Sequence, residues 1–470
     1  MDIDSVFHLY RNLYFKLPRG VRAFMGDVYG SLPLSVRFGK EYDKHRAILE
    51  KFESADDTYK MDFMFNKTLE TLKFAEENIP YYQRIFKERG FKTEDFKHFD
   101  DLKKLPFLTK PIIQKELDNL YTDKFDKPVP YYTGGSSSTP MKMYAPLSIS
   151  RAKEKAYSLY SFEQLGYKYR DKTVALRGRE TADPEKGIYW DYEMVDNYLQ
   201  PSGNYLEAPY IEKIVEEIKR YKPKFFYGYP SAVLSFMKAC RMKGIETIEG
   251  IKGVFLISES VFPEYIDDMR EFFKCSVLSH YGHTERNTMA YKIDHGYYHF
   301  FGSYGLTQVI DDEIVTLSFD NIVMPYINYK TQDYIEGKVE FYPGTSVVKR
   351  VEDIRGRIQE YLVTKEGNVI SILSIGAGHY NSYDYVDQAQ FYQDTPGKVT
   401  LFVQSEHPEK VKKDIMKKQM EDQVKGAIEF NIEFKDKIEK SKRGKRILVV
   451  QKLDVESFRK AKSEAYEQVS

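Results

Sequence analysis

A run of small and hydroxyl-bearing residues has the composition of an anion-binding loop. Tyr132-Thr-Gly-Gly-Ser-Ser-Ser-Thr-Pro140 is followed closely by Lys142. Glycine lets backbone N–H groups approach an anion, hydroxyl groups add hydrogen-bond donors, and lysine adds a mobile positive charge. The run therefore indicates a loop that holds the phosphates of a nucleoside triphosphate. A plain flexible surface loop has a similar composition, and the spacing matches neither the P-loop nor the dinucleotide-binding motif.

A second group of chemically capable residues is His280-Tyr-Gly-His-Thr-Glu285, which lies at the exit of an expected strand. A tyrosine can cover a flat base, a threonine can hydrogen-bond a phosphate, and a glutamate can hold magnesium. The two histidines and the glutamate also allow a zinc hydrolase as an alternative. They lie on a strand-to-turn segment, however, with no further ligand cluster nearby in the sequence, which argues against zinc.

The elements around this group follow an α/β pattern, in which helical and strand-like periods alternate from about residue 60. Strands are expected over 224–230, 251–257 and 276–281, and helices over 263–273 and around the apolar face of Ile211, Ile214, Val215 and Ile218. Ser231 is expected to cap the helix after the first of these strands. A parallel sheet follows, with ligands at the carboxyl ends of its strands.

Beyond about Arg355 the pattern changes. Strands are expected over 398–403, 430–434 and 446–450, with a helical stretch over 408–425. This β-α-β-β order predicts a small α+β domain. The expected division is therefore a large N-terminal domain over 1–355, with sheets and packed helices, and a small mobile C-terminal domain over 356–470.

Composition narrows the class of partner. The chain has 71 basic and 71 acidic residues, so it offers no net field that would attract nucleic acid. Its 2 cysteines are too few for a disulfide framework or a multi-cysteine zinc site, which fits a reducing cytoplasm. Both cysteines are expected to be small buried apolar residues. No apolar run long enough to span a membrane is present, so a soluble protein is expected. Residues 9–37 mix aromatic and basic side chains, which fits a packed arm or a peripheral membrane contact.

Three further motifs make a family resemblance clear: Tyr329-Lys-Thr-Gln-Asp333, Arg355-Gly-Arg357 and Ser441-Lys-Arg-Gly-Lys445. With the two groups above, they stand in the order found in adenylate-forming ligases. Within that superfamily the chain is most similar to the phenylacetate-coenzyme A ligase branch and its CapK-like relatives, which are associated with capsular polysaccharide genes. The resemblance covers residues from about 10 to 452.

The resemblance implies a reaction in which a carboxylate attacks the α-phosphate of ATP, pyrophosphate leaves, and an acyl-adenylate awaits a second nucleophile. It assigns Thr284 to the α-phosphate, Glu285 to Mg²⁺, Tyr281 to adenine and Asp333 to the ribose hydroxyls. Lys445 is the expected catalytic lysine, and Thr284 and Glu285 are the other two residues expected to be catalytic. A solvated basic turn is the alternative interpretation of the segment around Lys445. The remaining expected nucleotide-binding residues are Thr133, Gly134, Gly135, Ser136, Ser137, Ser138, Thr139, Lys142, Ser258, Glu259, Gly282, His283 and Arg357.

The acid-binding pocket is expected to involve Tyr227, Tyr229, Pro230 and His280, at the ends of predicted strands. The segment Ser258-Glu259-Ser260 matches one that lines the acyl and adenine pockets in the relatives. Turn chemistry and aromatic core packing explain the same residues equally well.

The chain departs from the family pattern at four places. Ser138 and Gln332 stand where glycines are usual, and Gln359 with Glu360 stands at the usual hinge aspartate. The glycine-rich loop that meets coenzyme A is replaced by Leu362–Ile370. The acceptor therefore stays open between coenzyme A, a sugar hydroxyl or amine, and a carrier thiol. A non-catalytic nucleotide-binding scaffold in polysaccharide biosynthesis is the alternative from a different functional class.

Overall fold

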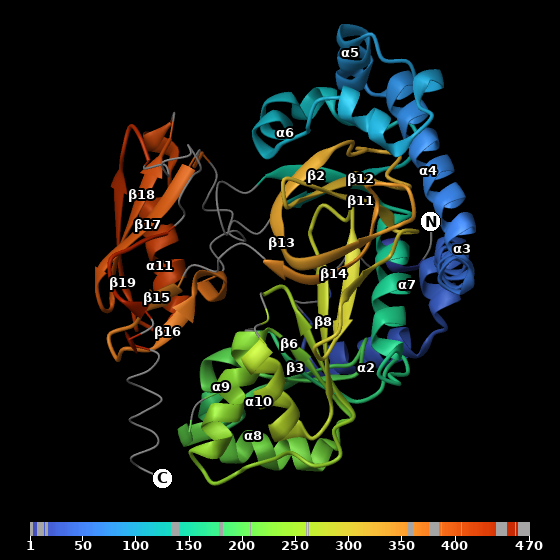
Figure 1. The fold of residues 1–470 in the computed structure, drawn as a ribbon. Helices are drawn as coiled ribbons and strands as arrows, with labels where there is room; N and C mark the ends of the chain where they lie inside the picture. Colours follow the sequence, from blue (N-terminus) through green and yellow to red (C-terminus); the bar gives the residue numbers. More distant parts are fainter. Residues whose placement is uncertain are drawn as a thin grey trace. The chain divides into compact units, whose positions relative to one another are not determined.

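Figure 1 shows a computed structural model of the protein. It describes residues 3–6, 14, 17–132, 141–177, 182–206, 208–259, 261, 263–355, 361–375, 385–386, 388–405, 407–438, 449–455 and 457–458. The chain divides into two compact units. The first comprises residues 1–131 and 143–357, and the second comprises residues 132–142 and 358–470.

The helices of the first unit form an N-terminal group and a group interleaved with strands. They are α2 (Arg19–Ser31), α3 (Leu34–Ser54), α4 (Asp57–Asn78), α5 (Pro80–Arg89), α6 (Lys110–Glu116), α7 (Ser150–Glu163), α8 (Ala208–Tyr221), α9 (Pro230–Arg241) and α10 (Pro263–Phe273). The expected bounds of α10 are confirmed. The expected cap at Ser231 is wrong: α9 begins one residue earlier, because Pro230 supplies the first helical position and Tyr229 is the N-cap.

The main sheet combines a parallel and an antiparallel part. Among the described residues it has twelve strands in the order β11-β12-β13-β14-β10-β9-β8-β7-β6-β3-β5-β4. Their bounds are β3 (Thr173–Leu176), β4 (Trp190–Glu193), β5 (Tyr198–Pro201), β6 (Phe225–Gly228), β7 (Gly253–Ile257), β8 (Ser276–Gly282), β9 (Met289–Ile293), β10 (Tyr298–Phe300), β11 (Gly305–Ile310), β12 (Glu313–Ser318), β13 (Tyr329–Phe341) and β14 (Val348–Arg355). Strands β5, β3, β6, β7 and β8 run parallel, as predicted for β6 to β8. From β8 onward the pairing is antiparallel, which the sequence patterns did not indicate. A separate two-stranded sheet joins β1 (Pro128–Tyr132) and β2 (Lys142–Pro146).

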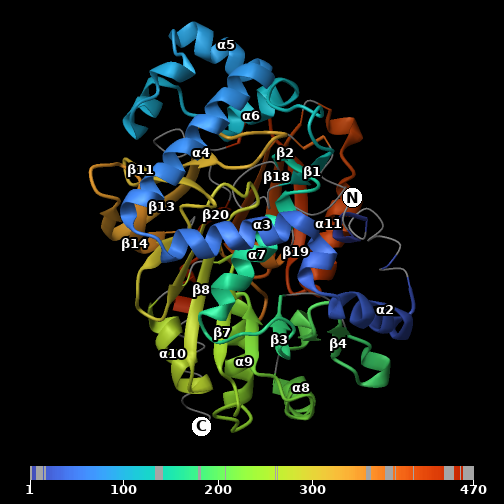
Figure 2. The ribbon, with the colours of Figure 1, turned by 90° about the vertical axis from the view of Figure 1, so that its right-hand side faces the viewer.

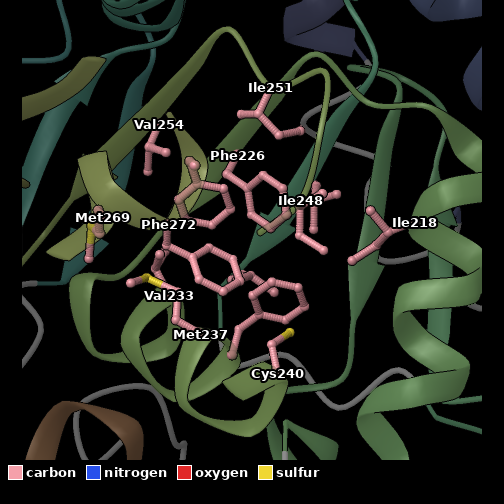
Figure 3. Close-up of a cluster of buried hydrophobic side chains, with 14 of the residues drawn as sticks. Ile218, Phe226, Val233, Met237, Cys240, Ile248, Ile251, Val254, Met269 and Phe272 are labelled. Carbon is pink, nitrogen blue, oxygen red and sulfur yellow. The ribbon is translucent and has the colours of Figure 1, made fainter. Parts of the chain in front are cut away.

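Alternate residues of the parallel strands enter two different cores. On one face, Phe226, Val254 and Val277 pack with the apolar sides of α8, α9 and α10, the cluster shown in Figure 3. On the other face, Phe255 and Leu278 pack with residues of α7 and the segment after it. Helix α7 in turn lies beside α3, as Figures 1 and 2 both show. The carboxyl ends of these strands are therefore held between helices on both faces.

The second unit is built on a four-stranded sheet with the order β19-β18-β17-β20. Its strands and helix are β15 (Tyr361–Val363), β16 (Val369–Ser371), β17 (Gln388–Thr395), β18 (Lys398–Gln404), α11 (Lys413–Gln423), β19 (Glu429–Phe434) and β20 (Val449–Gln451). Met416 and Met420 of α11 pack into the core of this sheet. The helix is shorter than the predicted stretch, because a separate 3₁₀ turn covers Pro408–Lys410. Strands β15, β16 and β17 were not predicted.

Across the part of the chain that the structure describes, no helix combines the length and apolarity needed to cross a bilayer.

Candidate nucleotide and acid site

The carboxyl end of β8 brings together two residues expected to bind the nucleoside. The hydroxyl of Tyr281 donates a hydrogen bond to Oδ2 of Asp333 at 2.9 Å. Both side chains are half-buried. Tyr281 lies on β8, the last strand of the parallel part of the sheet. Asp333 lies on β13, which belongs to the antiparallel part of the same sheet. The site thus places an aromatic ring next to a carboxylate that can accept two hydroxyl groups.

Glu285 is a buried carboxylate that is held in its charged form. Its side chain is enclosed, with the residue 7% exposed, and Oε1 accepts a hydrogen bond from the hydroxyl of Tyr329 at 2.6 Å. Nδ1 of His283 lies 3.4 Å from Oε2. Burial on its own would favour the neutral acid. The neighbouring imidazole, the ammonium of Lys110 and the Tyr329 hydroxyl outweigh burial, so the pKa of Glu285 lies well below its usual range.

Arg286 continues the turn after Glu285 and connects it to α7. Its guanidinium donates to the hydroxyl of Ser150 and lies 4.6 Å from the ring centroid of Tyr131. Nε lies 3.9 Å from the carboxylate of Glu154, which also accepts a hydrogen bond from Tyr304 at 2.6 Å. The turn is therefore attached to the helix that covers one face of the sheet.

That same face carries two of the residues expected in the acid pocket. The ring of Phe162 on α7 lies 5.8 Å from the ring of Tyr227 and 6.2 Å from the ring of His280. Nε2 of His280 is buried without a hydrogen-bond partner. Burial lowers the pKa of His280, partly opposed by the carboxylate of Glu154, so the imidazole stays neutral. Tyr229 is half-buried and Pro230 is buried, just beyond β6.

The other expected site residues fall into two groups. Thr284 and Ser258 are exposed and Glu259 is half-buried, beyond the ends of β8 and β7, and Gly282 is the exposed last residue of β8. Lys142 is exposed, opens β2, and belongs to the second unit. Residues 133–140, with the predicted phosphate loop, Ser260, Arg357, Gln359, Glu360 and Lys445 lie outside the described residues.

Two departures from the family pattern have a visible structural form. Gln332 adopts φ of +66°, a left-handed conformation that glycine takes without strain, and its N–H donates to Oε1 of Glu313 at 3.0 Å. Leu362–Ile370 spans most of the β15–β16 hairpin, and in the turn between the two strands the N–H of Thr364 donates to the carbonyl of Asn368 at 2.8 Å.

The residues present fit a magnesium ion better than zinc. Among the described residues, no cluster of three or more His, Cys, Asp or Glu side chains could hold a metal. Magnesium is commonly held by one or two carboxylates together with substrate phosphates and water. An ionised, buried Glu285 meets that requirement.

Two polar residues of this site were not assigned by the sequence analysis. Tyr329 opens the motif in which only Asp333 was given a role, and Arg286 directly follows Glu285. Their positions next to residues with an assigned role were the sequence signal that could have identified them. Their partners, Glu285 and Ser150, are distant in sequence, so no local pattern indicates these contacts.

A surface hollow of about 450 Å³ lies elsewhere, between Arg241, Glu246, Asp268 and Lys274. It adjoins the amino ends of β7 and β8, opposite the edge that carries Tyr281, and its Arg241 and Asp268 already pair with each other. It is therefore not the nucleotide site.

Comparisons with known proteins agree with this architecture. The chain is 20% identical over 448 residues to the protein CapK of Staphylococcus aureus, covering 92% of this chain and 97% of CapK. It is 24% identical over 329 residues to the phenylacetate-coenzyme A ligase of Escherichia coli (strain K12), covering 64% and 71% of the two chains. A solved 2-hydroxyisobutyryl-CoA ligase, in complex with 2-HIB-AMP and CoA, matches with a TM-score of 0.53 at 14% identity, covering 87% of this chain and 92% of that one. No family model matches the chain.

The fold is that of the two-domain adenylate-forming ligases. As the sequence motifs predicted, the chain is similar in sequence to CapK and to phenylacetate-coenzyme A ligase.

Proposed function

We propose that the protein activates a carboxylic acid with ATP. The acid's carboxylate attacks the α-phosphorus, the bond to the β-phosphate oxygen breaks, and pyrophosphate leaves, so that an acyl-adenylate remains. The acyl group then passes to a nucleophile and AMP is released. The similarity to an acyl-CoA ligase and to CapK over most of the chain supports this reaction class.

The observation that carries the proposal is the pair of tyrosine–carboxylate contacts at one end of β8. Tyr281 with Asp333 and Tyr329 with Glu285 bring four residues from two distant motifs into one site. The ring of Tyr281 is suited to cover adenine, and Asp333 is suited to accept both ribose hydroxyls. Exposed Thr284, which lies between Tyr281 and Glu285 in the sequence, is suited to donate to the α-phosphate.

Glu285 would hold Mg²⁺, whose charge, when bound, offsets the repulsion between the carboxylate and the triphosphate. The low pKa of Glu285 keeps this ligand anionic across the physiological range. The fixed tyrosine hydroxyl on Oε1 orients the carboxylate, so little reorganisation is needed when charge develops.

We further propose that residues 133–142 hold the β- and γ-phosphates and that residues 356–470 form a mobile small domain. Arg357 would contact the nucleotide at the domain junction. Lys445 of the small domain would bridge the acid and the α-phosphate, where a positive charge lowers the barrier most. Ser258, Glu259, Gly282 and His283 would border the nucleotide, and Tyr227, Tyr229, Pro230 and His280 the acid.

The acceptor is either coenzyme A or a sugar hydroxyl or amine of a polysaccharide. The likeness to phenylacetate-coenzyme A ligase supports the first. The second, like a carrier thiol, rests on the sequence resemblance to CapK-like relatives alone. The hairpin at Leu362–Ile370 in place of a glycine-rich loop favours an acceptor other than coenzyme A. The need for ATP, together with two free cysteines, favours the cytoplasm as the location.

The test is pyrophosphate release measured over a broad panel of carboxylic acids, with and without coenzyme A. We expect at least one acid to elicit release that depends on ATP, and Glu285→Gln to reduce it about a hundredfold or more. A thioester product that requires coenzyme A would identify the acceptor. Tight ATP binding with no release for any acid would contradict the proposal and favour the scaffold.

A further inference from the structure

An arginine at the carboxyl edge of the parallel sheet has no anionic partner among the residues that the structure describes. Arg177 directly follows β3, where Ala175 pairs with Tyr227 of β6. Because side chains alternate along a strand, Arg177 lies on the same face as Tyr227. Its guanidinium carbon is 5.3 Å from the centroid of the Tyr227 ring. This is the face that α7 covers and that also carries His280.

Asp196, a carboxylate whose charge acts on Arg177, is already paired with another cation. Its Oδ1 lies 2.8 Å from Nζ of Lys155. Within the described part of the chain, Arg177 takes part in no ion pair, although it is half-buried. A guanidinium partly withdrawn from water without a carboxylate partner carries a desolvation cost, which an anionic ligand would offset.

The surroundings of Arg177 keep it charged. The nearby Tyr227 phenol is the largest influence and raises the pKa of Arg177, while burial opposes it. On the same face, Nε2 of His280 is buried and lacks a hydrogen-bond partner. The acid side of the site therefore holds a fixed positive charge and a polar atom, in an otherwise aromatic setting that includes Phe162 and Tyr227.

We infer that the acid carries a second negatively charged group, which Arg177 binds. This inference rests on the proposed function, because it assigns the non-reacting end of the same substrate. A guanidinium binds a carboxylate or phosphate through two parallel hydrogen bonds, while the Tyr227 ring supports its other face. The substrate class is then a dicarboxylic acid, or an acid with a phosphate or sulfonate at its far end.

The sheet also sets the length of this substrate. Strands β8 and β3 are separated by β7 and β6, which are three steps in the sheet. At about 4.8 Å per step, β8 and β3 are roughly 14 Å apart. The arginine side chain spans part of this distance. We therefore expect a substrate with a chain of about six to eight carbons, or an aromatic ring, between its two charges.

The experiment compares acids matched in carbon number: adipate with hexanoate, suberate with octanoate, and terephthalate with p-toluate. ATP–pyrophosphate exchange is measured for the full-length protein, for Arg177→Gln and for Arg177→Lys. Arg220→Gln is the matched control, because Arg220 is a surface residue of α8 with 72% of its side chain exposed. Calorimetric binding of each acid without nucleotide is measured in parallel.

We expect kcat/KM for exchange to be at least tenfold higher with each dianionic acid than with the monoanionic acid of the same carbon number. Arg177→Gln should lower kcat/KM for the dianion 10- to 100-fold, mainly through KM, and should lower monoanion exchange far less. Arg177→Lys should lose less, because it keeps the charge but not the planar fork. The Arg220→Gln control should match the unmodified protein.

The two proposals fail in different ways. Exchange with monoanions equal to that with dianions, and unaffected by Arg177→Gln, overturns the inference and leaves the proposed function standing. Dianion binding that requires Arg177, without exchange, overturns the proposed function and supports the anion site. Neither exchange nor Arg177-dependent binding for any acid of the panel contradicts both.

Discussion

At the scale of single residues, the site is organised by two carboxylates that differ in environment. Asp333 is half-buried and shares a hydrogen bond with Tyr281, so it is accessible to a polar ligand. Glu285 is enclosed and held ionised by Tyr329, His283 and Lys110. One carboxylate is thus suited to hydroxyl groups and the other to a cation.

Gln332 gives a prediction at this scale, because it adopts a left-handed conformation at a position where the family resemblance implies glycine. Gln332→Gly should raise the free energy of unfolding by about 1 kcal/mol, since relief of the backbone strain exceeds the entropy cost of glycine. Thermal denaturation is the measurement. Gln332→Ala is the control, because it shortens the side chain but keeps the strain. A glycine variant no more stable than the alanine variant would show that the conformation is not strained.

The residue types at the site were predictable, but their contacts were not. Tyr281, Glu285 and Asp333 were identified from motifs, since a base, a metal and a ribose each require a particular functional group. The partnership of Tyr281 with Asp333 spans 52 residues of sequence. Arg177 gave no signal, because a single arginine after a strand is common and its missing partner is visible only in three dimensions.

At the scale of elements, the packing of α3, α4 and α7 depends on a buried charge. Nζ of Lys153 on α7 donates to the carbonyls of Tyr304 and Phe319 at 2.7 and 2.9 Å and lies 3.1 Å from Asp320. Lys67 of α4 lies 3.0 Å from the other oxygen of Asp320. Since α7 carries Glu154 and Phe162, this cluster fixes the helix that covers the acid side of the site.

His45 of α3 lies beside this cluster and makes stability depend on pH. It is fully buried, and burial together with the charge of Lys153 lowers its pKa to about 3, although Asp320 opposes this. In the unfolded chain the pKa is about 6.5, so below that pH the unfolded state binds the extra proton. The native state therefore loses up to about 1.4 kcal/mol per pH unit as the pH falls from 6.5 toward 3.

The corresponding measurement is the melting temperature between pH 7.5 and pH 5. The unmodified protein should lose stability over this range, and His45→Phe, which cannot take up a proton, should lose distinctly less. His280 contributes with the same sign, since its pKa is also lowered, so some slope should remain. His295→Gln is the control, because His295 is an exposed residue. Identical slopes for His45→Phe and the unmodified protein would contradict this account.

Helices and strands could be predicted from sequence where the pattern that marks them lies within a short segment. The strands β6, β7 and β8 and helix α10 follow from short apolar runs and flanking prolines or serines. The antiparallel strands β9 to β14 were not predicted. Several of them form hairpins with the next strand in sequence, such as β11 with β12 and β13 with β14, whereas β10 pairs with the distant β14. Strand β12 is buried along its whole length, so it lacks the alternation that marks a half-buried strand. Strand β17, which pairs with the adjacent β18, was also missed. The helix after β6 was predicted, but Pro230 rather than Ser231 begins it.

At the scale of the whole molecule, balanced charge and two compact units agree with a protein that acts on a small molecule. The residues proposed to bind the nucleoside and the acid, where the structure describes them, belong to the first unit. The predicted catalytic lysine belongs to the second. The proposed reaction therefore requires residues of both units, whereas the proposed adenosine site uses only the first.

Lys445→Ala, measured in the full chain by acid-dependent ATP–pyrophosphate exchange alongside ATP binding, tests this central claim most directly. We predict that exchange falls at least a hundredfold while the affinity for ATP stays within a few-fold of the unmodified protein. Lys437→Ala, a second lysine of the same unit, should leave both unchanged. Near-normal exchange in Lys445→Ala would remove that lysine from the chemistry and contradict the account.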